Sequence, residues 1–185
     1  MCLATLIYLL THLLIEVGRV EFTVIEVPDV VYEVLARKAK YLGRTVVDVI
    51  VDSVISNLDP ESRVEVYLKL HDKYLSDAED LYRRGDLTQA SEKYWGAVYA
   101  ILSAIAESGG LPHFRHGHFE ELIELLSEEL NDRELPKLFA SAERLHANFY
   151  HGFLRKFGFE IHREDVLKLV EKLRNYLTEL RSTRC

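Results

Sequence analysis

Apolar residues recur every three or four positions along most of the chain after residue 59, which is the spacing of one face of an α-helix. The pattern predicts helices over residues 60–84, 86–107, 118–130, 135–156 and 163–182. Asp59 followed by Pro60 is typical of a helix start, and Gly85 and Gly110 are typical of helix ends. Because the links are short, successive helices should run antiparallel. Residues 59–185 are therefore predicted to form an up-and-down helical bundle, and the fold class is mainly α.

A different pattern occupies residues 1–58. β-Branched residues alternate imperfectly with polar ones over residues 20–27, which predicts a strand that ends at Pro28. Helical spacing follows over residues 30–41 and 45–57. A strand and two helices in this order resemble the ribbon-helix-helix fold, in which two chains pair their strands and strand side chains can contact DNA. Glu21 and Glu26 would face DNA phosphates unfavourably, so this small strand-helix-helix module favours dimerisation over DNA binding.

The stretch LATLIYLLTHLLI, residues 3–15, is apolar until Glu16 interrupts it. A helix needs roughly 20 apolar residues to cross a bilayer, so no membrane span is expected here. The stretch also lacks the positive leading region and the small-residue cleavage site of a signal peptide. We expect it to be an additional element packed on the fold or an over-extended start site, and a membrane anchor is a less favoured alternative.

The chain carries 30 acidic and 23 basic residues, a formal net charge of −7. Residues 1–58 hold 7 acidic and 5 basic residues, and residues 59–185 hold 23 acidic and 18 basic residues. Neither part has the excess of basic residues that is typical of proteins contacting the nucleic-acid backbone over a large surface. Contact with RNA would need a local patch. A single glutamine and four asparagines beside abundant charge are typical of a heat-adapted protein.

Cys2 and Cys185 lie at the two ends of the sequence and match neither a zinc-binding spacing nor a secreted disulfide framework. A reducing cytoplasm is the simplest interpretation. The sequence contains no phosphate-binding glycine loop and no nucleophile elbow, so most hydrolase and redox classes are excluded and no cofactor is expected.

Two segments carry a resemblance to a known family. They are LYRRGDLTQASEKYWGAVYAIL, residues 81–102, and ERLHANFYHGFL, residues 143–154. Together they resemble the archaeal PaREP family, whose members are assigned to the HEPN superfamily of helical bundles, and the similarity extends over most of residues 55–180. The resemblance implies either a binding and dimerisation scaffold or a metal-independent ribonuclease. The ribonuclease motif of that superfamily is an arginine followed, after about four to six residues, by a histidine.

Arg144 and His151 fit the outer limit of that motif, because six residues lie between them. Seven steps of 100° bring His151 back to within about 20° of Arg144, and Asn148 is predicted to lie on the same flank. Such a trio suits RNA cleavage: the imidazole would transfer protons, the guanidinium would stabilise the phosphorane and the amide would orient the phosphate. The simpler interpretation is a solvated flank, and Leu145 stands where the motif usually has a polar residue.

His146 lies on the other side of the same helix, about 160° from Arg144. It is expected to be a core-edge histidine hydrogen-bonded to the bundle, or else to line a pocket with Tyr94, Trp95 and Tyr150. A second group, His113, His116 and His118, has a spacing that could bind a divalent metal, although capping or interface roles are the simpler interpretation.

The sequence therefore predicts a cytoplasmic helical scaffold, expected to be a homodimer, that binds RNA, a nucleotide or another protein. The alternative is a metal-independent, toxin-like endoribonuclease that uses Arg144 and His151 with help from Asn148. A further alternative, DNA binding through the N-terminal ribbon, is disfavoured by the strand glutamates.

Overall fold

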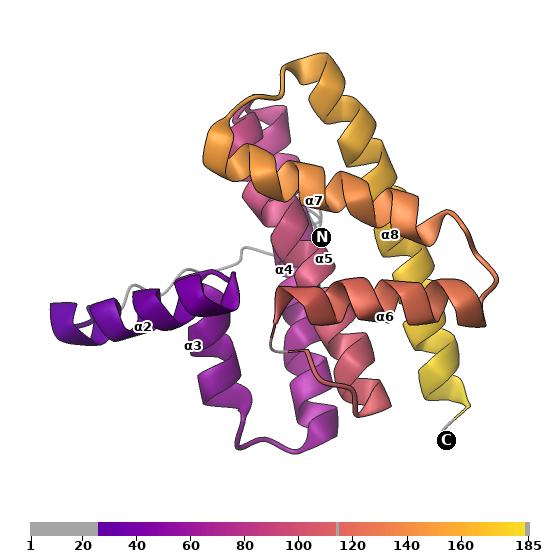
Figure 1. The fold of residues 1–185 in the computed structure, drawn as a ribbon, viewed down its shortest axis with the longest axis horizontal. Helices are drawn as coiled ribbons and strands as arrows, with labels where there is room; N and C mark the ends of the chain where they lie inside the picture. The colour runs from indigo at the N-terminus through magenta and orange to yellow at the C-terminus, as the bar shows by residue number, and fades with distance from the viewer. Residues whose placement is uncertain (1–25, 114, 184–185) are drawn as a thin grey trace, which may run out of the picture.

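The computed structural model describes residues 26–113 and 115–183, and all regular secondary structure in this part of the chain is helical (Figure 1). Its helices are α2 (Asp29–Leu42), α3 (Val46–Ile55), α4 (Pro60–Arg83), α5 (Leu87–Gly109), α6 (His116–Glu129), α7 (Leu135–His151) and α8 (Lys156–Ser182). The predicted mainly-α bundle is confirmed. The N-terminal strand is not supported: Glu26 and Val27 form no strand, and residues 20–25 lie outside the described part, as does the apolar stretch 3–15.

Helix α5 is the centre of the bundle. Every residue from Ala97 to Ala106 is buried, so this helix is covered on all sides rather than along one stripe. It packs along α4, and α7 and α8 cover it from the other side, while α6 crosses the lower part of the bundle (Figure 1). Gly96 lets the ring of Tyr74 approach closely, because an added Cβ would lie 3.1 Å from its Cδ2 atom.

The helix boundaries follow the predicted signals in the first half of the bundle. Asp59 caps α4 by accepting a hydrogen bond from the backbone N–H of Ser62 at 3.0 Å, and Gly110 ends α5 in the left-handed conformation. The predictions for the last two helices were wrong at one end each. Gly152, with φ 58°, ends α7 five residues early, and α8 begins at Lys156 instead of residue 163.

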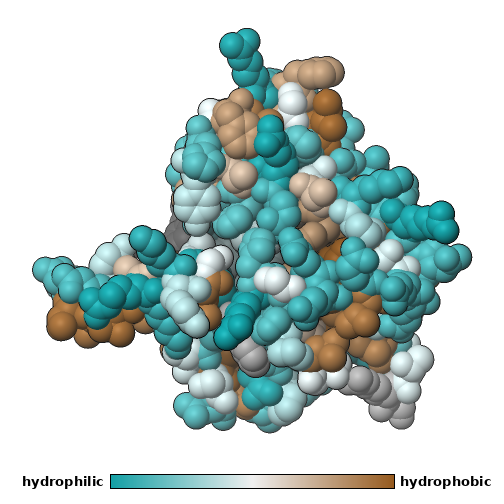
Figure 2. Space-filling view, in the orientation of Figure 1, coloured by the Kyte–Doolittle hydropathy of each residue, from teal (hydrophilic) through white to brown (hydrophobic). Residues whose placement is uncertain are grey.

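Helices α2 and α3 form a hairpin beside the bundle, and α2 projects away from it (Figure 1). Helix α2 packs mainly on α3, through Ala39 and its neighbours, and exposes most of its remaining apolar side chains. Figure 2 shows these side chains as a brown stripe along the lower edge of α2. None of the helices in residues 26–113 and 115–183 is long and apolar enough to cross a membrane.

Candidate functional site

Of the predicted pair, His151 is the last residue of α7, and Arg144 lies about two turns before it on the same helix. The link from α7 to α8 is at the top of Figure 1. Both side chains are exposed. The guanidinium of Arg144 stacks over the ring of Phe153 at 4.2 Å from the ring centroid, and it has no carboxylate partner among the described residues. This stacking holds Arg144 in place while its N–H donors remain available to an oxyanion.

Asn148 does not share this exposed flank, so that prediction was wrong. Its side chain is only 1% exposed and faces the bundle interior. The amide donates to the hydroxyl of Ser91 on α5 at 2.9 Å and accepts from the backbone N–H of Leu154 at 2.7 Å. Asn148 therefore anchors the α7–α8 link to the bundle. Helical periodicity places Asn148 only about 40° from Arg144, and this angle is enough for one side chain to face solvent and the other to face the core.

The link adds charged and aromatic side chains that the sequence interpretation did not single out. Arg155, Lys156 and Phe157 are exposed, Phe157 to 78%, and Tyr150 on α7 is 58% exposed. We call the following set the basic–aromatic tip: Arg144, Tyr150, His151, Phe153, Arg155, Lys156 and Phe157. Figure 2 shows tan and brown side chains beside teal ones at this end of the molecule. A signal was present in the sequence, because residues 144–159 contain no aspartate or glutamate.

A second histidine lies behind Arg144, across the α7–α8 interface. The Nδ1 atom of His162 is 3.1 Å from the hydroxyl of Ser141, which donates to Asp165 at 2.7 Å. Because that hydroxyl uses its proton on Asp165, Nδ1 carries a proton and Nε2 is left as the basic nitrogen. Burial, and then the charge of Arg144, lower the pKa of His162, which keeps the imidazole neutral near pH 7. This pairing could not be predicted from the sequence, because residue 162 was expected to precede the helix.

Three of the four predicted pocket residues do come together. The ring of His146 stacks on Trp95 with centroids 4.6 Å apart, and Tyr150 meets His146 edge-on at 5.3 Å. His116, at the start of α6, stacks on Trp95 at 5.1 Å and lies 5.8 Å from His146. We call Trp95, His116, His146 and Tyr150 the ring cluster. It connects α6 to the basic–aromatic tip through Tyr150.

The pKa values of the two histidines in the ring cluster are shifted in opposite directions. A hydrogen bond at 2.9 Å with Glu143 raises the pKa of His116. Burial lowers the pKa of His146, and its Nδ1 atom has no hydrogen-bond partner among the described residues. The expected hydrogen bond of His146 to the bundle is therefore absent at this nitrogen, and stacking holds the ring instead.

Tyr94 belongs to a different part of the molecule, so its predicted place in this pocket was wrong. It is fully buried on another face of α5, where its hydroxyl donates to Glu79 at 2.5 Å. Arg163 on α8 donates to that hydroxyl at 2.7 Å and to both carboxylate oxygens of Glu79. The three side chains tie α4, α5 and α8 together.

The structure does not bring together the side chains of His113, His116 and His118. It therefore does not support the metal site that their spacing suggested. His113 approaches the Tyr67 hydroxyl at 3.3 Å and Glu107 at 3.4 Å, and Nδ1 of His118 accepts from the backbone N–H of Arg115 at 3.3 Å. No group of three or more potential metal ligands occurs within residues 26–113 and 115–183. The expected capping role fits His118, which satisfies a backbone donor at the start of α6.

Comparison with known proteins shows similarity to archaeal proteins in sequence and in fold. The model of the archaeal PaREP1/PaREP8 family matches residues 66–170, which include the ring cluster and the whole tip. A crystal structure of a protein from Sulfolobus solfataricus is similar, with 28% identity and a TM-score of 0.52 over 58% of this chain and 95% of that one. No curated protein matches the chain.

Proposed function

We propose that this chain, which belongs to the archaeal PaREP1/PaREP8 family, is a HEPN-type helical scaffold that binds single-stranded RNA through the basic–aromatic tip. The observation that carries the proposal is the local composition of the tip. Three exposed rings alternate with Arg144, His151, Arg155 and Lys156 over a segment that contains no acidic residue, in a chain whose formal net charge is −7.

The tip supplies both interactions that single strands require. Unpaired bases stack on exposed aromatic rings, and phosphates bind arginine and lysine side chains along the same path. Phe157 and Tyr150 offer rings to solvent, and Arg155 has no carboxylate partner among the described residues. Arg144, held on Phe153, offers a planar pair of donors that matches a phosphate.

Binding is tested by fluorescence anisotropy with a labelled mixed-sequence RNA oligonucleotide over a range of salt concentrations. Loss of one stacked base costs about 1–3 kcal/mol, so Phe157→Ala should weaken binding by roughly 5- to 150-fold. Arg155→Gln should lower the slope of log K against log salt by about 0.7. Tyr32→Ala on α2 and Arg133→Gln before α7 are the matched controls, since both residues are exposed and lie off the tip. Tip variants that bind as well as these controls would refute the proposal.

RNA cleavage is a second candidate activity of the same end of the molecule, favoured by the neutral His162 beside the cationic Arg144. His162 or His151 would accept the 2′-hydroxyl proton, and Arg144 would stabilise the charge on the phosphorane. The test is RNA incubation in EDTA with the wild type and with Arg144→Ala, His151→Ala and His162→Ala. Cleavage that persists in all three variants, or no cleavage by the wild type, rules out this activity.

We further propose that two copies pair through α2. Val30, Val31, Val34 and Tyr41 form an exposed stripe on this helix, Tyr41 to 81%. The acidic residues of α2 lie in its first half and its basic residues in the second, so an antiparallel pair places opposite charges against each other. A second copy therefore matches the stripe in both polarity and charge.

The pairing is tested by light scattering. Val34→Glu should convert a dimer into a monomer, whereas Leu58→Glu, at a comparably exposed position outside α2, should leave the mass unchanged. A Val34→Glu protein with the mass of the wild type would exclude α2 as the dimer interface. DNA binding through the N-terminal ribbon gains no support, because the expected strand lies almost wholly outside the described residues.

A further inference from the structure

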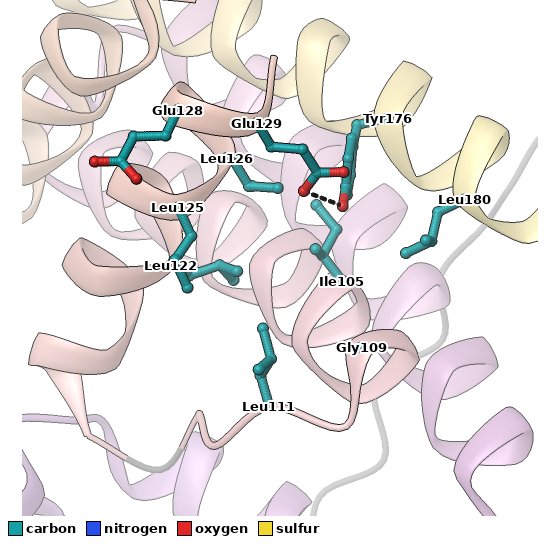
Figure 3. A pocket seen from close by; sticks show the side chains of 10 residues that line it. All are labelled: Ile105, Gly109, Leu111, Leu122, Leu125, Leu126, Glu128, Glu129, Tyr176 and Leu180. Carbon is teal, nitrogen blue, oxygen red and sulfur yellow. Dashed lines mark hydrogen bonds between the residues drawn. The ribbon is translucent and has the colours of Figure 1, made fainter. Parts of the chain in front are cut away.

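An apolar groove opens between the end of α5, α6 and the last turns of α8, far from the basic–aromatic tip. The groove has a volume of about 390 Å³. Figure 3 shows its apolar side chains arranged around a common space. Helix α6 contributes Leu122, Leu125 and Leu126, and the other walls come from Ile105, Gly109, Leu111, Tyr176 and Leu180. The side chains of Glu128 and Glu129 lie along one edge (Figure 3).

The floor and the rim of the groove differ in exposure. Leu122, Leu126 and Ile105 are buried, whereas Leu111 and Leu125 at the rim are exposed, Leu125 to 53%. Isolated exposed leucines are ordinary on a protein surface, but leucines gathered around one concavity mark a surface for a partner. Because the rim leucines extend the apolar surface beyond the cavity, the feature suits a side chain carried on a larger partner.

The charge of α6 defines the chemistry of that partner. The helix carries five glutamates and no lysine or arginine. At the groove, the Tyr176 hydroxyl donates to Glu129 at 3.1 Å, which fixes this carboxylate at the edge, and Glu128 is exposed beside it. A cationic partner gains attraction from both carboxylates, and an anionic one is repelled.

We infer that this groove is a docking site for a cationic amphipathic helix of another protein. The partner helix inserts leucine-like side chains at positions i and i+3 or i+4 between Leu111, Leu125 and Leu180, and its lysines or arginines meet Glu128 and Glu129. This surface is distinct from the RNA-binding tip, and it does not depend on the proposed function.

Charge separates this partner from the other candidates for the groove. A second copy that presented the same face would set glutamates of α6 against glutamates. The apolar stretch at residues 3–15 contains no lysine or arginine to meet Glu128 and Glu129. RNA would bring phosphates to an acidic edge. A cationic amphipathic helix satisfies both the leucines and the carboxylates.

The test uses the full-length protein and a fluorescent 18-residue peptide of leucine and lysine in helical periodicity. A peptide of the same composition in scrambled order, and a leucine–glutamate peptide, serve as comparison probes. We expect the periodic lysine peptide to bind at least tenfold more tightly than either. Leu125→Glu, and Glu128→Gln combined with Glu129→Gln, should each weaken binding by at least tenfold, because they remove the apolar contact and the charge contact separately.

Matched controls show whether the effect belongs to the groove. Leu58→Glu places the same substitution at another exposed leucine, and Glu164→Gln removes an exposed glutamate from α8, so both should bind the peptide like the wild type. Equal binding to the scrambled peptide, or unchanged binding to Leu125→Glu, overturns the inference. A lower oligomeric mass of the Leu125→Glu protein also overturns it, because that result would assign the groove to a second copy. Stronger peptide binding after removal of residues 1–25 overturns it too, because that result would assign the groove to this segment.

Discussion

Substitution of Asn148 by alanine distinguishes an anchoring role from the catalytic role that the sequence suggested. The buried amide makes two hydrogen bonds, one to Ser91 and one from the backbone of Leu154. Each bond contributes about 1 kcal/mol, and a partly buried donor left without a partner costs about 1 kcal/mol more, the low end of the penalty for buried groups. Since the Leu154 N–H loses its acceptor, Asn148→Ala should lower the free energy of unfolding by about 3 kcal/mol.

For a chain of this length, about 3 kcal/mol corresponds to a fall in Tm of roughly 6–12 °C. The assay is thermal unfolding followed by circular dichroism. Asn175→Ala is the matched control, because Asn175 is an exposed asparagine on α8. Its Tm should stay within about 2 °C of the wild type, since surface substitutions usually change stability by less than about 0.5 kcal/mol.

The reasoning would be refuted by equal Tm values for the two alanine variants. A catalytic orienting role for Asn148 makes a different prediction, namely an unchanged Tm with a loss of RNA cleavage. Asn148→Asp separates the two roles further. It retains an acceptor for the Leu154 N–H but removes the donor to Ser91 and introduces a buried charge, so it should be at least as unstable as the alanine variant.

Two further predictions concern single contacts. Glu143→Gln should lower the pKa of His116, whose ordinary value is 6.5, and NMR titration would measure this change. The stabilisation from the His116–Glu143 pair is complete below pH 6.5 and disappears as the pH rises through the raised pKa. The stability difference between variant and wild type must therefore shrink in alkaline buffer. Gly96→Ala should not raise the free energy of unfolding by the roughly 1 kcal/mol seen in open helices, because its Cβ would lie 3.1 Å from Tyr74. Gly158→Ala is the control, since its Cβ meets only ordinary contacts. Equal gains for the two variants in denaturant titrations would contradict this prediction.

The bundle could be predicted because its signals are local. Apolar spacing and caps such as Asp59 act within a few residues, and they place α4 and α5 within two residues of their observed ends. The boundary between α7 and α8 could not be predicted in the same way. Phe153 continued the apolar spacing beyond Gly152, and only the left-handed turn at that glycine shows that the chain leaves the helix.

The candidate site was predictable only where one helix carries it. His146 and Tyr150 lie four residues apart on α7, so helical spacing predicts one shared face, and their rings are in contact. Trp95, which was grouped with them, comes from α5 and stacks on His146. Tyr94 was misplaced because adjacent residues on a helix point about 100° apart, and that angle turns it toward Glu79 on α4 and Arg163 on α8. Contacts between helices, such as Ser141 with His162, depend on packing that periodicity does not encode.

The opposite charges of the two proposed surfaces bear on how they would act together. The tip is free of acidic residues over positions 144–159, whereas α6 carries five glutamates. If both proposals hold, RNA and a cationic helix occupy different surfaces, and both should bind at once. A cationic helix on α6 also neutralises carboxylates that repel RNA, which should strengthen RNA binding at low ionic strength. Because charges in solvent are screened beyond about 10 Å at 0.1 M salt, this coupling should fade as salt is added, whereas coupling carried through the ring cluster would persist.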